Sequence, residues 1–507
     1  MAREIELKLG LPPEAGAKVC AHPLLQGVAP GQRLVSTYYD TPDLRLHRNG
    51  IALRVREVDG SLVQTVKCAG AVAGGLSDRP EWEQPWFGVF EFSGVDDRSV
   101  AVSLNAVASR LTPVFTTEFR RELRTFADGE TVIRAMLDQG WIRAGGAEEP
   151  LCELELELEA GAPRDLYQLA LRLSEALPLW PEDRSKAERG YRMWQGAEIG
   201  RAGHEPPLSR RLPASAAFVR LVGGEVRSWQ RDLRLAGEDP VEGVHQIRVT
   251  MRRLRSLLQL FSPVLEGDFS AIWRRRLGDN ARRLGAVRDL DVFCDQLLPQ
   301  LIEDLDWGDW RGVSQVLEDE RRAARANAQA TLAPQVQGRL MLEWMAAVSE
   351  LPLADKDIDL DTLAAQRMAR LRKRLGKRAA GLPAADAAAW HALRIAAKRL
   401  RYGLDFLAPL WPAKAVGKYR RHLARIQKYL GRVQDVEVAS ATLARLATGP
   451  AECTLVQRHL ERHYRKPVKQ WRRKALREAR RLLAEKPPWQ PRRPPISTRR
   501  QDSHQLS

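Results

Sequence analysis

Apolar and polar positions alternate along the first third of the chain and follow a longer period afterwards. A period of two residues is typical of β-strands, and Gly, Pro, Asn or Asp residues separate several of the alternating runs. The pattern therefore predicts antiparallel strands, followed by a helix over residues 163–177 where the apolar spacing becomes helical. The alternating runs are Arg3–Leu9, Ala52–Glu57, Leu62–Lys67, Val132–Asp138 and Leu151–Glu159.

The second part of the chain has a helical pattern. Residues 215–485 are rich in Leu, Ala and Arg, with apolar residues three and four apart, which predicts long amphipathic helices. Gly, Pro and polar residues gather in 201–214, so we expect a linker there between residues 1–200 and the helical region. Residues 486–507 are Pro-rich and polar, which predicts a disordered tail.

The helical region contains an internal repeat. HQIRVTMRRLR at 245–255 matches HALRIAAKRLR at 391–401, and LGAVRDLDV at 284–292 matches LGRVQDVEV at 430–438. Both pairs are separated by 146 residues. Two matches at one separation predict two similar helical bundles in tandem, so the expected class is an α+β multidomain chain.

Charge divides the chain at the same place. The formal net charge of +17 comes from 81 Lys and Arg against 64 Asp and Glu. Residues 1–200 hold 23 basic and 30 acidic residues, whereas residues 201–507 hold 58 basic and 34 acidic residues. The basic part is expected to bind a polyanion, which could be a nucleic acid, an anionic membrane surface or a phosphate polymer.

Several structural classes are excluded by the sequence. The five cysteines are scattered without a CxxC motif or a Cys/His cluster, which argues against a disulfide scaffold and a structural zinc site. The N-terminus has no apolar segment like that of a signal peptide, and no apolar run approaches 18 residues. We therefore expect a cytoplasmic protein without membrane insertion.

The charged residues of the predicted strands share one face, because successive side chains of a strand point to opposite sides. One solvated face of an antiparallel sheet would explain any single strand. A closed barrel whose lumen receives all the charged faces would explain the combination, since carboxylates bind hard divalent cations and Arg or Lys bind phosphate oxygens. The same-face sets include Glu4, Glu6 and Lys8, then Arg54 and Arg56, then Thr65 and Lys67, and finally Glu153, Glu155 and Glu157.

These residues resemble the CYTH, or triphosphate tunnel metalloenzyme, superfamily. The resemblance covers nearly all of residues 1–195 and implies a tunnel of about eight antiparallel strands that hydrolyses a triphosphate with Mg²⁺ or Mn²⁺. The motifs that carry it are ExExK (4–8), YYDTP (38–42), LRVR (53–56), QTVK (64–67), GGLSDRPEWE (74–83), FRRELR (119–124), LDQG (137–140), CELELELE (152–159) and RSKAERGY (184–191).

The resemblance also implies roles for single residues. Arg120 and Arg121 point to opposite faces, and the FRRE match favours Arg121 as the lumen residue. Glu157 is an extra acid on the same face, so which glutamates of this strand would bind metal stays open. The implied phosphate-binding residues are Lys8, Arg54, Arg56, Lys67, Arg121 and Lys186, and the implied metal ligands are Glu4, Glu6, Asp138, Glu153 and Glu155.

The choice among candidate substrates rests on the family resemblance rather than on the chemistry of single residues. Relatives of this fold act on thiamine triphosphate, RNA 5′ ends, ATP or inorganic tripolyphosphate. The strings LDQG, CELELELE and SKAERGY resemble bacterial inorganic triphosphatases, which favours hydrolysis of tripolyphosphate to pyrophosphate and phosphate.

The repeat carries two basic stripes with the spacing i, i+3, i+7 and i+10, which places each stripe on one helix face. An exposed basic face is the simplest interpretation of one stripe, but like charges at this spacing repel unless an anion relieves them. This half resembles the CHAD domain, which is associated with polyphosphate and often fused to CYTH. The stripes are His245, Arg248, Arg252 and Arg255, and then His391, Arg394, Lys398 and Arg401.

The leading hypothesis is a metal-dependent inorganic triphosphatase with a polyphosphate-binding module that would associate with polyphosphate granules. One alternative is a polyphosphate-binding or granule-associated protein without significant catalysis. Another is a triphosphatase acting on thiamine triphosphate, nucleotides or RNA ends. The helical half lacks the interleaved aromatics that stack single-stranded bases, which argues against nucleic acid as its partner.

Overall fold

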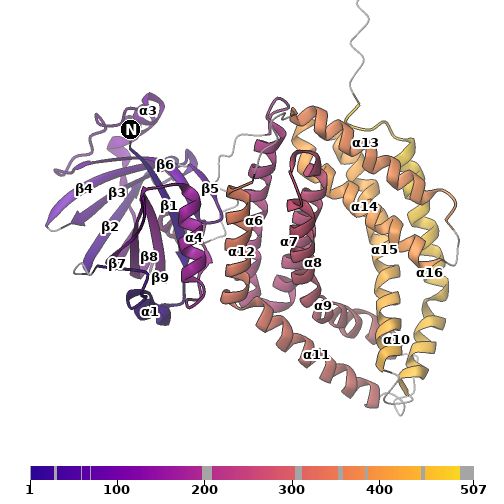
Figure 1. Ribbon diagram of the computed structural model, residues 1–507. Helices are drawn as coiled ribbons and strands as arrows, with labels where there is room; N and C mark the ends of the chain where they lie inside the picture. Colours follow the sequence, from indigo (N-terminus) through magenta and orange to yellow (C-terminus); the bar gives the residue numbers. More distant parts are fainter. Residues whose placement is uncertain are drawn as a thin grey trace, which may run out of the picture. The chain divides into compact units, whose positions relative to one another are not determined.

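A computed structural model describes residues 2–27, 31–58, 60–68, 70–196, 208–302, 311–351, 358–382, 386–446 and 452–490. The strands and helices drawn in Figure 1 belong to two compact units. The first comprises Met1–Pro207, Phe218–Asp291 and Leu317–Asp355, and the second comprises Leu208–Ala217, Val292–Val316 and Lys356–Ser507. The first unit therefore contains the strands together with the first copy of the helical repeat. Half of the predicted linker, residues 201–207, lies outside the described residues.

The strands form a closed antiparallel barrel. Its order is β1-β9-β8-β7-β2-β3-β4-β6, and β6 pairs again with β1 to close the ring. The expected barrel of about eight strands is confirmed. The strands are β1 (Ala2–Gly10), β2 (Gln32–Asp40), β3 (Ile51–Val58), β4 (Ser61–Cys68), β5 (Ala71–Ala73), β6 (Leu76–Pro85), β7 (Thr112–Asp128), β8 (Thr131–Ala144), β9 (Ala147–Ala160) and β10 (Trp180–Pro181).

Strand β1 is buried on both faces over Glu6–Leu9, one face with apolar and the other with charged side chains, which explains its alternation. On β1 the apolar Leu7 and Leu9 are fully buried, yet Glu6 and Lys8 are only 2% and 5% exposed. The five alternating runs are confirmed as β1, β3, β4, β8 and β9. Alternation did not reveal β2, β6 or β7: β6 mixes Pro80 with charges on both faces, and β7 has adjacent arginines.

Five short helices accompany the barrel. The predicted helix over 163–177 is α4, although it ends at Leu173, and it packs on β1 and β9. Helix α5 begins after Ser185, whose hydroxyl accepts from the Glu188 amide while the Glu188 carboxylate accepts from the Ser185 amide. This capping box fixes the first turn of α5, which packs on β7 and β8. The helices are α1 (Gly16–Cys20), α2 (Arg45–Arg48), α3 (Arg98–Asn105), α4 (Pro163–Leu173) and α5 (Lys186–Gln195).

Helices make up the rest of the described chain, as the apolar spacing predicts. Asp239 caps α7 and Asp386 caps α14, so both stripe helices begin at an aspartate. The helices are α6 (Ala214–Glu238), α7 (Pro240–Phe261), α8 (Phe269–Arg283), α9 (Gly285–Val292), α10 (Leu298–Ile302), α11 (Arg311–Leu332), α12 (Pro334–Ser349), α13 (Leu360–Ala379), α14 (Ala387–Leu407), α15 (Ala413–Leu446) and α16 (Glu452–Ala484).

The two copies of the repeat share helices but differ in where these are interrupted. The second copy runs without a break through α15, whereas the matching part of the first copy is divided into α8 and α9. Trp344 of α12 packs on Trp273 with ring centroids 5.0 Å apart. In the second copy Trp489 packs on Tyr419 at 5.4 Å, and Tyr419 stands 146 residues after Trp273. The segment after α16 therefore takes the place of α12.

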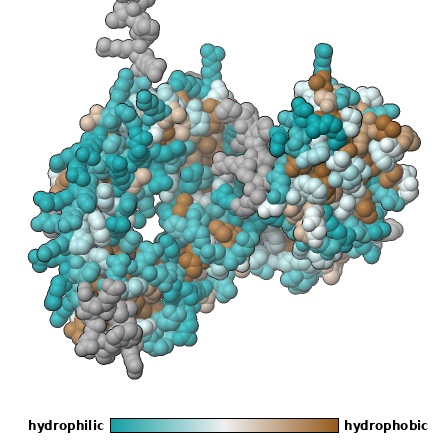
Figure 2. All heavy atoms as spheres, turned by 180° about the vertical axis from the view of Figure 1, so that it is seen from behind, coloured by the Kyte–Doolittle hydropathy of each residue, from teal (hydrophilic) through white to brown (hydrophobic). Residues whose placement is uncertain are grey.

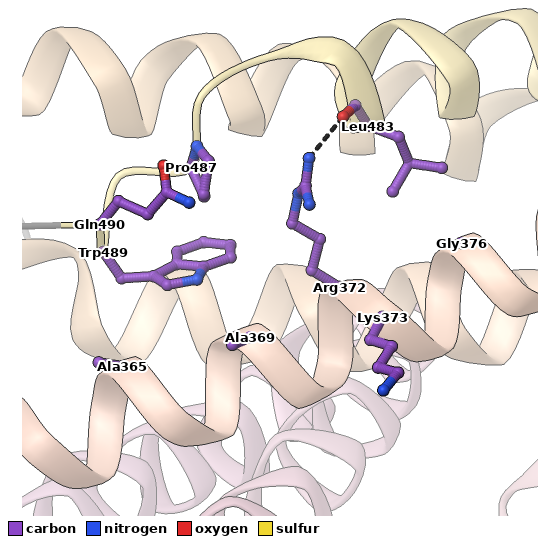
Figure 3. A pocket seen from close by; sticks show the side chains of 9 residues that line it. All are labelled: Ala365, Ala369, Arg372, Lys373, Gly376, Leu483, Pro487, Trp489 and Gln490. Carbon is purple, nitrogen blue, oxygen red and sulfur yellow. Dashed lines mark hydrogen bonds between the residues drawn. The ribbon is translucent and has the colours of Figure 1, made fainter.

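The predicted disorder from residue 486 is wrong for the first residues of the tail. Trp489 is 7% exposed, and the segment 486–490 folds back beside α13, where Arg372 donates to the Leu483 carbonyl (Figure 3). The apolar indole ring of Trp489 favours packing of this segment. The high proline content of the tail had predicted disorder instead. A cavity of about 470 Å³ lies there, lined by none of the predicted phosphate-binding residues. Residues 491–507 lie outside the described residues.

Among the described residues, none of the helices has the length and apolar content needed to cross a membrane. The face of the helical region seen in Figure 2 is mostly hydrophilic. This surface agrees with the amphipathic pattern, because the apolar stripe of each helix is used inside its bundle.

Candidate functional site

Three buried carboxylates meet inside the barrel. Asp138 of β8 pairs with Glu153 of β9, and Glu155 follows two residues later on the same face. One carboxylate oxygen from each lies within 4.8 Å of the other two. Hard divalent cations prefer such oxygen ligands, and one Glu153 oxygen is buried without a hydrogen-bond partner among the described residues. These donors therefore fit a divalent metal ion.

Two cationic side chains hold the carboxylates together. Lys186, the first residue of α5, places its Nζ 2.8 Å from Asp138 Oδ2 and 2.9 Å from Glu155 Oε1, and it also contacts Glu153. Arg121 donates to both Asp138 oxygens at 2.7 Å and to Glu155 Oε2 at 2.7 Å. An entering metal ion would therefore share these oxygens with a lysine and an arginine.

The electrostatics of this cluster follow from burial and pairing. Burial alone would lower the pKa of Lys186, but Asp138, Glu153 and Glu155 raise it above its ordinary value. Burial favours the neutral form of Glu155, yet Lys186 and Arg121 hold its pKa well below the usual range. Burial dominates at Glu153, whose pKa is raised. The cluster thus contains one firmly ionised glutamate and one that tolerates neutralisation.

The structure does not bring Glu4 and Glu6 into this cluster. Glu4 lies 3.2 Å from Lys67 Nζ, and Lys67 also contacts Glu81 Oε2 at 2.7 Å. Glu6 accepts from Arg79 Nη2 at 2.7 Å and from Ser77 Oγ at 3.0 Å. The five predicted metal ligands are therefore divided between the three-carboxylate cluster and a second region of the lumen.

The remaining predicted phosphate-binding residues also line the lumen. Arg54 lies 3.7 Å from both Glu81 and Glu83, and Lys8 lies 3.7 Å from Glu155. Arg56 donates to Ser36 Oγ at 2.9 Å. Burial and the nearby Arg54 lower the pKa of Arg56 to about 10, so an anion beside Arg56 would relieve an unfavourable charge.

The first basic stripe lies on one face of α7. Arg248 donates to the Leu284 carbonyl at 2.9 Å and lies 3.7 Å from Asp289. The Nε atoms of Arg252 and Arg255 are buried without hydrogen-bond partners among the described residues. Burial lowers the pKa of His245, and the neighbouring Arg288 lowers it further. The first stripe therefore gathers positive charge on half-buried side chains.

The second stripe, on α14, has different polar partners. His391 Nδ1 lies 2.5 Å from Gln434 Oε1, and Arg401 donates to Gln427 at 2.6 Å. Asp405 lies 3.6 Å from Arg401. Gln434 occupies the position that Arg288 holds in the first copy, which replaces a repulsion beside the histidine by a hydrogen bond. The two stripes share their spacing but differ in electrostatics.

Two family models match the chain. Residues 2–191 match the CYTH domain, and residues 220–444 match the CHAD domain. The chain is a CYTH–CHAD protein. Both family resemblances found in the sequence are confirmed, and the barrel and the helical region described above are the two matched domains.

The chain is also similar to several known proteins. An inorganic triphosphatase from Haemophilus influenzae is 33% identical over 193 residues, which are 38% of this chain and 55% of that protein, so the chain spans about half of that relative. An uncharacterised protein from Mycobacterium tuberculosis is 28% identical over 74% of this chain and 76% of its own length. The CHAD domain crystal structure from the plant Ricinus communis is 31% identical with a TM-score of 0.46, covering 56% of this chain and 99% of that structure.

Sequence reasoning missed one aromatic residue of the CYTH lumen. Phe119 shares a strand face with Arg121, and its ring centroid lies 5.7 Å from the guanidinium groups of Arg56 and Arg121 and 5.0 Å from Lys186 Nζ. An aromatic face attracts cations, so the ring holds three of them near one another. The parity that placed Arg121 inside the barrel also places Phe119 there, which is the signal that would have found it.

Proposed function

We propose that the CYTH domain hydrolyses inorganic tripolyphosphate to pyrophosphate and phosphate, and that the CHAD domain binds inorganic polyphosphate. The observation that carries the enzymatic part is the cluster of Asp138, Glu153 and Glu155 beside Lys186 and Arg121, because it joins carboxylates for a cation with cations for phosphate. The 33% sequence identity with the Haemophilus inorganic triphosphatase supports tripolyphosphate as the proposed substrate.

The lumen residues supply positioning and charge. Arg54, Arg56 and Lys67 would hold the oxygens of an extended triphosphate along the barrel, while Arg121 and Lys186 would hold the end that lies at the carboxylates. Water attacks a terminal phosphorus, a new P–O bond forms, and the bond to the bridging oxygen breaks so that pyrophosphate leaves. These fixed charges favour that step because they need no rearrangement as negative charge shifts between oxygens.

The carboxylates would hold Mg²⁺ or Mn²⁺. A divalent cation bound by Asp138, Glu153 and Glu155 would neutralise phosphate charge and make a nearby water more acidic. Glu4 and Glu6 are the second candidate group, although Lys67 and Arg79 contact them.

The first prediction concerns the substrate. With Mg²⁺ or Mn²⁺, the purified chain is expected to release phosphate from tripolyphosphate at least about tenfold faster than from ATP or thiamine triphosphate. The reason is that the described charged side chains of the lumen would bind phosphate oxygens rather than a base. A substrate panel with phosphate detection and metal titration measures this. A higher kcat/KM for ATP would contradict the substrate, and the absence of turnover on every triphosphate would support a binding protein without catalysis.

The second prediction separates the two domains. Changing Arg248→Ala and Arg394→Ala together is expected to weaken binding of long-chain polyphosphate about 10- to 100-fold, since each stripe loses a central cation. Tripolyphosphate hydrolysis is expected to change less than about twofold. Polyphosphate titration and the phosphate-release assay are run on the same preparation.

The control for the stripe pair removes two exposed arginines outside the stripes, through Arg322→Ala and Arg164→Ala. It keeps the charge loss equal while sparing α7 and α14. Equal weakening by both double variants would show that polyphosphate binding follows net charge rather than the stripes. Equal loss of binding and hydrolysis in the stripe variant would contradict the division of labour between the domains.

A further inference from the structure

We infer that Gln230 and Arg234, two residues of the CHAD domain, are positioning residues for Lys186 in the CYTH lumen. The inference rests on the proposed function for its kinetic test. Helix α6 carries both residues, and its part from Phe218 onward belongs to the same compact unit as the barrel. Their side chains contact the segment Glu182–Asp183, which lies between β10 and α5. We call this set of contacts the α6 latch.

Gln230 forms a two-point contact with Asp183. Its Nε2 donates to Asp183 Oδ1 at 3.2 Å, and its Oε1 accepts from the Asp183 amide at 3.3 Å. The Gly75 amide donates to the same Asp183 oxygen at 2.5 Å. Burial raises the pKa of Asp183 to about 6, because these donors only partly replace water. Gln230 is itself buried, so the contact is shielded from solvent.

Arg234 contacts the preceding residue. Its Nη1 lies 3.4 Å from Glu182 Oε1, an oxygen that also accepts from the Arg184 amide at 3.0 Å. Burial favours the neutral form of Glu182, but Arg184 and Arg234 lower its pKa to about 2. Glu182 is therefore ionised and depends on these arginines, since a buried carboxylate without a cation is costly.

The latched segment adjoins two lumen lysines. The Glu182 amide donates to the Lys8 carbonyl at 3.0 Å, and the Lys8 amide donates to the Gly75 carbonyl at 2.9 Å. Lys186 follows Asp183 by three residues and opens α5, where it reaches all three carboxylates. A shift of this segment would move Lys186 relative to the reacting phosphate, and misplacement by about 1 Å can cost on the order of 100-fold in rate.

The latch also reaches the helix that bears the first stripe. Asp232, between the two latch residues, accepts from Thr250 of α7 at 2.7 Å. Arg253 of α7 donates to Glu225 of α6 at 2.6 and 2.7 Å. The same helix is thus fixed on one side by the stripe helix and on the other by the segment that positions Lys186.

The test is a double-mutant cycle. The pair Gln230→Ala and Arg234→Ala is expected to lower kcat on tripolyphosphate about tenfold with KM changed less than about threefold. In a Lys186→Met background the same pair is expected to cause no further loss, because both changes act through one side chain. Arg231→Ala on the same helix, whose side chain is half exposed, is the matched control and is expected to leave kcat unchanged.

A second measurement does not depend on turnover. Hydrogen exchange at the first turn of α5 is expected to be about tenfold faster in the double variant, with α4 unchanged. If the wild type hydrolyses no triphosphate, the proposed function fails while this exchange experiment still tests the latch. Unchanged exchange in α5, or an equal further loss of kcat in the Lys186→Met background, would overturn the inference.

Discussion

Replacing Glu153 with glutamine is expected to lower kcat about 1,000-fold while leaving the fold at least as stable. Glu153 offers an oxygen to the three-carboxylate cluster, and glutamine removes its charge with little change in shape. The pKa of Glu153 is raised by burial, so its ionised form costs folding free energy at neutral pH. Neutralising it relieves that cost, whereas catalysis loses a ligand. Phosphate release and the thermal midpoint are measured together.

The matched control is Glu157→Gln. Glu157 lies on the same face of β9, and burial and neighbouring glutamates raise its pKa too, but it lies 3.6 Å from Arg134 and outside the cluster. Its kcat is expected to fall less than about threefold. In a Mn²⁺ titration, Glu153→Gln is expected to bind the ion more weakly than the wild type, whereas Glu157→Gln is expected to bind it as the wild type does. Comparable losses in both variants would place the metal ligands across the whole acidic strand.

The sequence predicted the barrel well because a strand buried on both faces leaves a strong pattern. Charges at every second position of β1 and β9 had to face a shared interior, since Leu7, Leu154 and Leu156 fill the outside. What alternation did not predict was the pairing inside the lumen. Glu155 contacts Arg121 and Glu4 contacts Lys67 because of the register and shear between strands. The sequence of a single strand does not specify that register.

The helical half was predictable to a different depth. Spacing placed each stripe on one face, and the repeat showed that there were two of them. The contrast between the copies depends on partners far along the chain, such as Gln434 beside His391. The packing of Trp489 was missed because the prediction used the composition of the whole tail. The contact of its single ring with Tyr419 fixes the position of the first residues of the tail.

Replacing Arg56 with methionine is expected to have opposite effects on stability and on activity. Methionine keeps much of the apolar volume of the side chain and removes its charge. We expect kcat/KM for tripolyphosphate to fall about 1,000-fold, because a cation that holds the phosphates is lost. The substrate-free protein should become more stable, since burial and Arg54 lower the pKa of Arg56 to about 10. Each pKa unit corresponds to about 1.4 kcal/mol, which limits the gain to about 3 kcal/mol.

The sign of the stability change makes this prediction informative. A structural arginine, like one in a buried ion pair, would lower the melting temperature when removed. Arg56 donates to Ser36 instead of a carboxylate, so removal of Arg56 should raise the melting temperature. The control is Arg120→Met on β7, whose exposed side chain lies outside the lumen and should leave both quantities nearly unchanged. A lower melting temperature, or full activity in Arg56→Met, would show that Arg56 supports the barrel rather than the substrate.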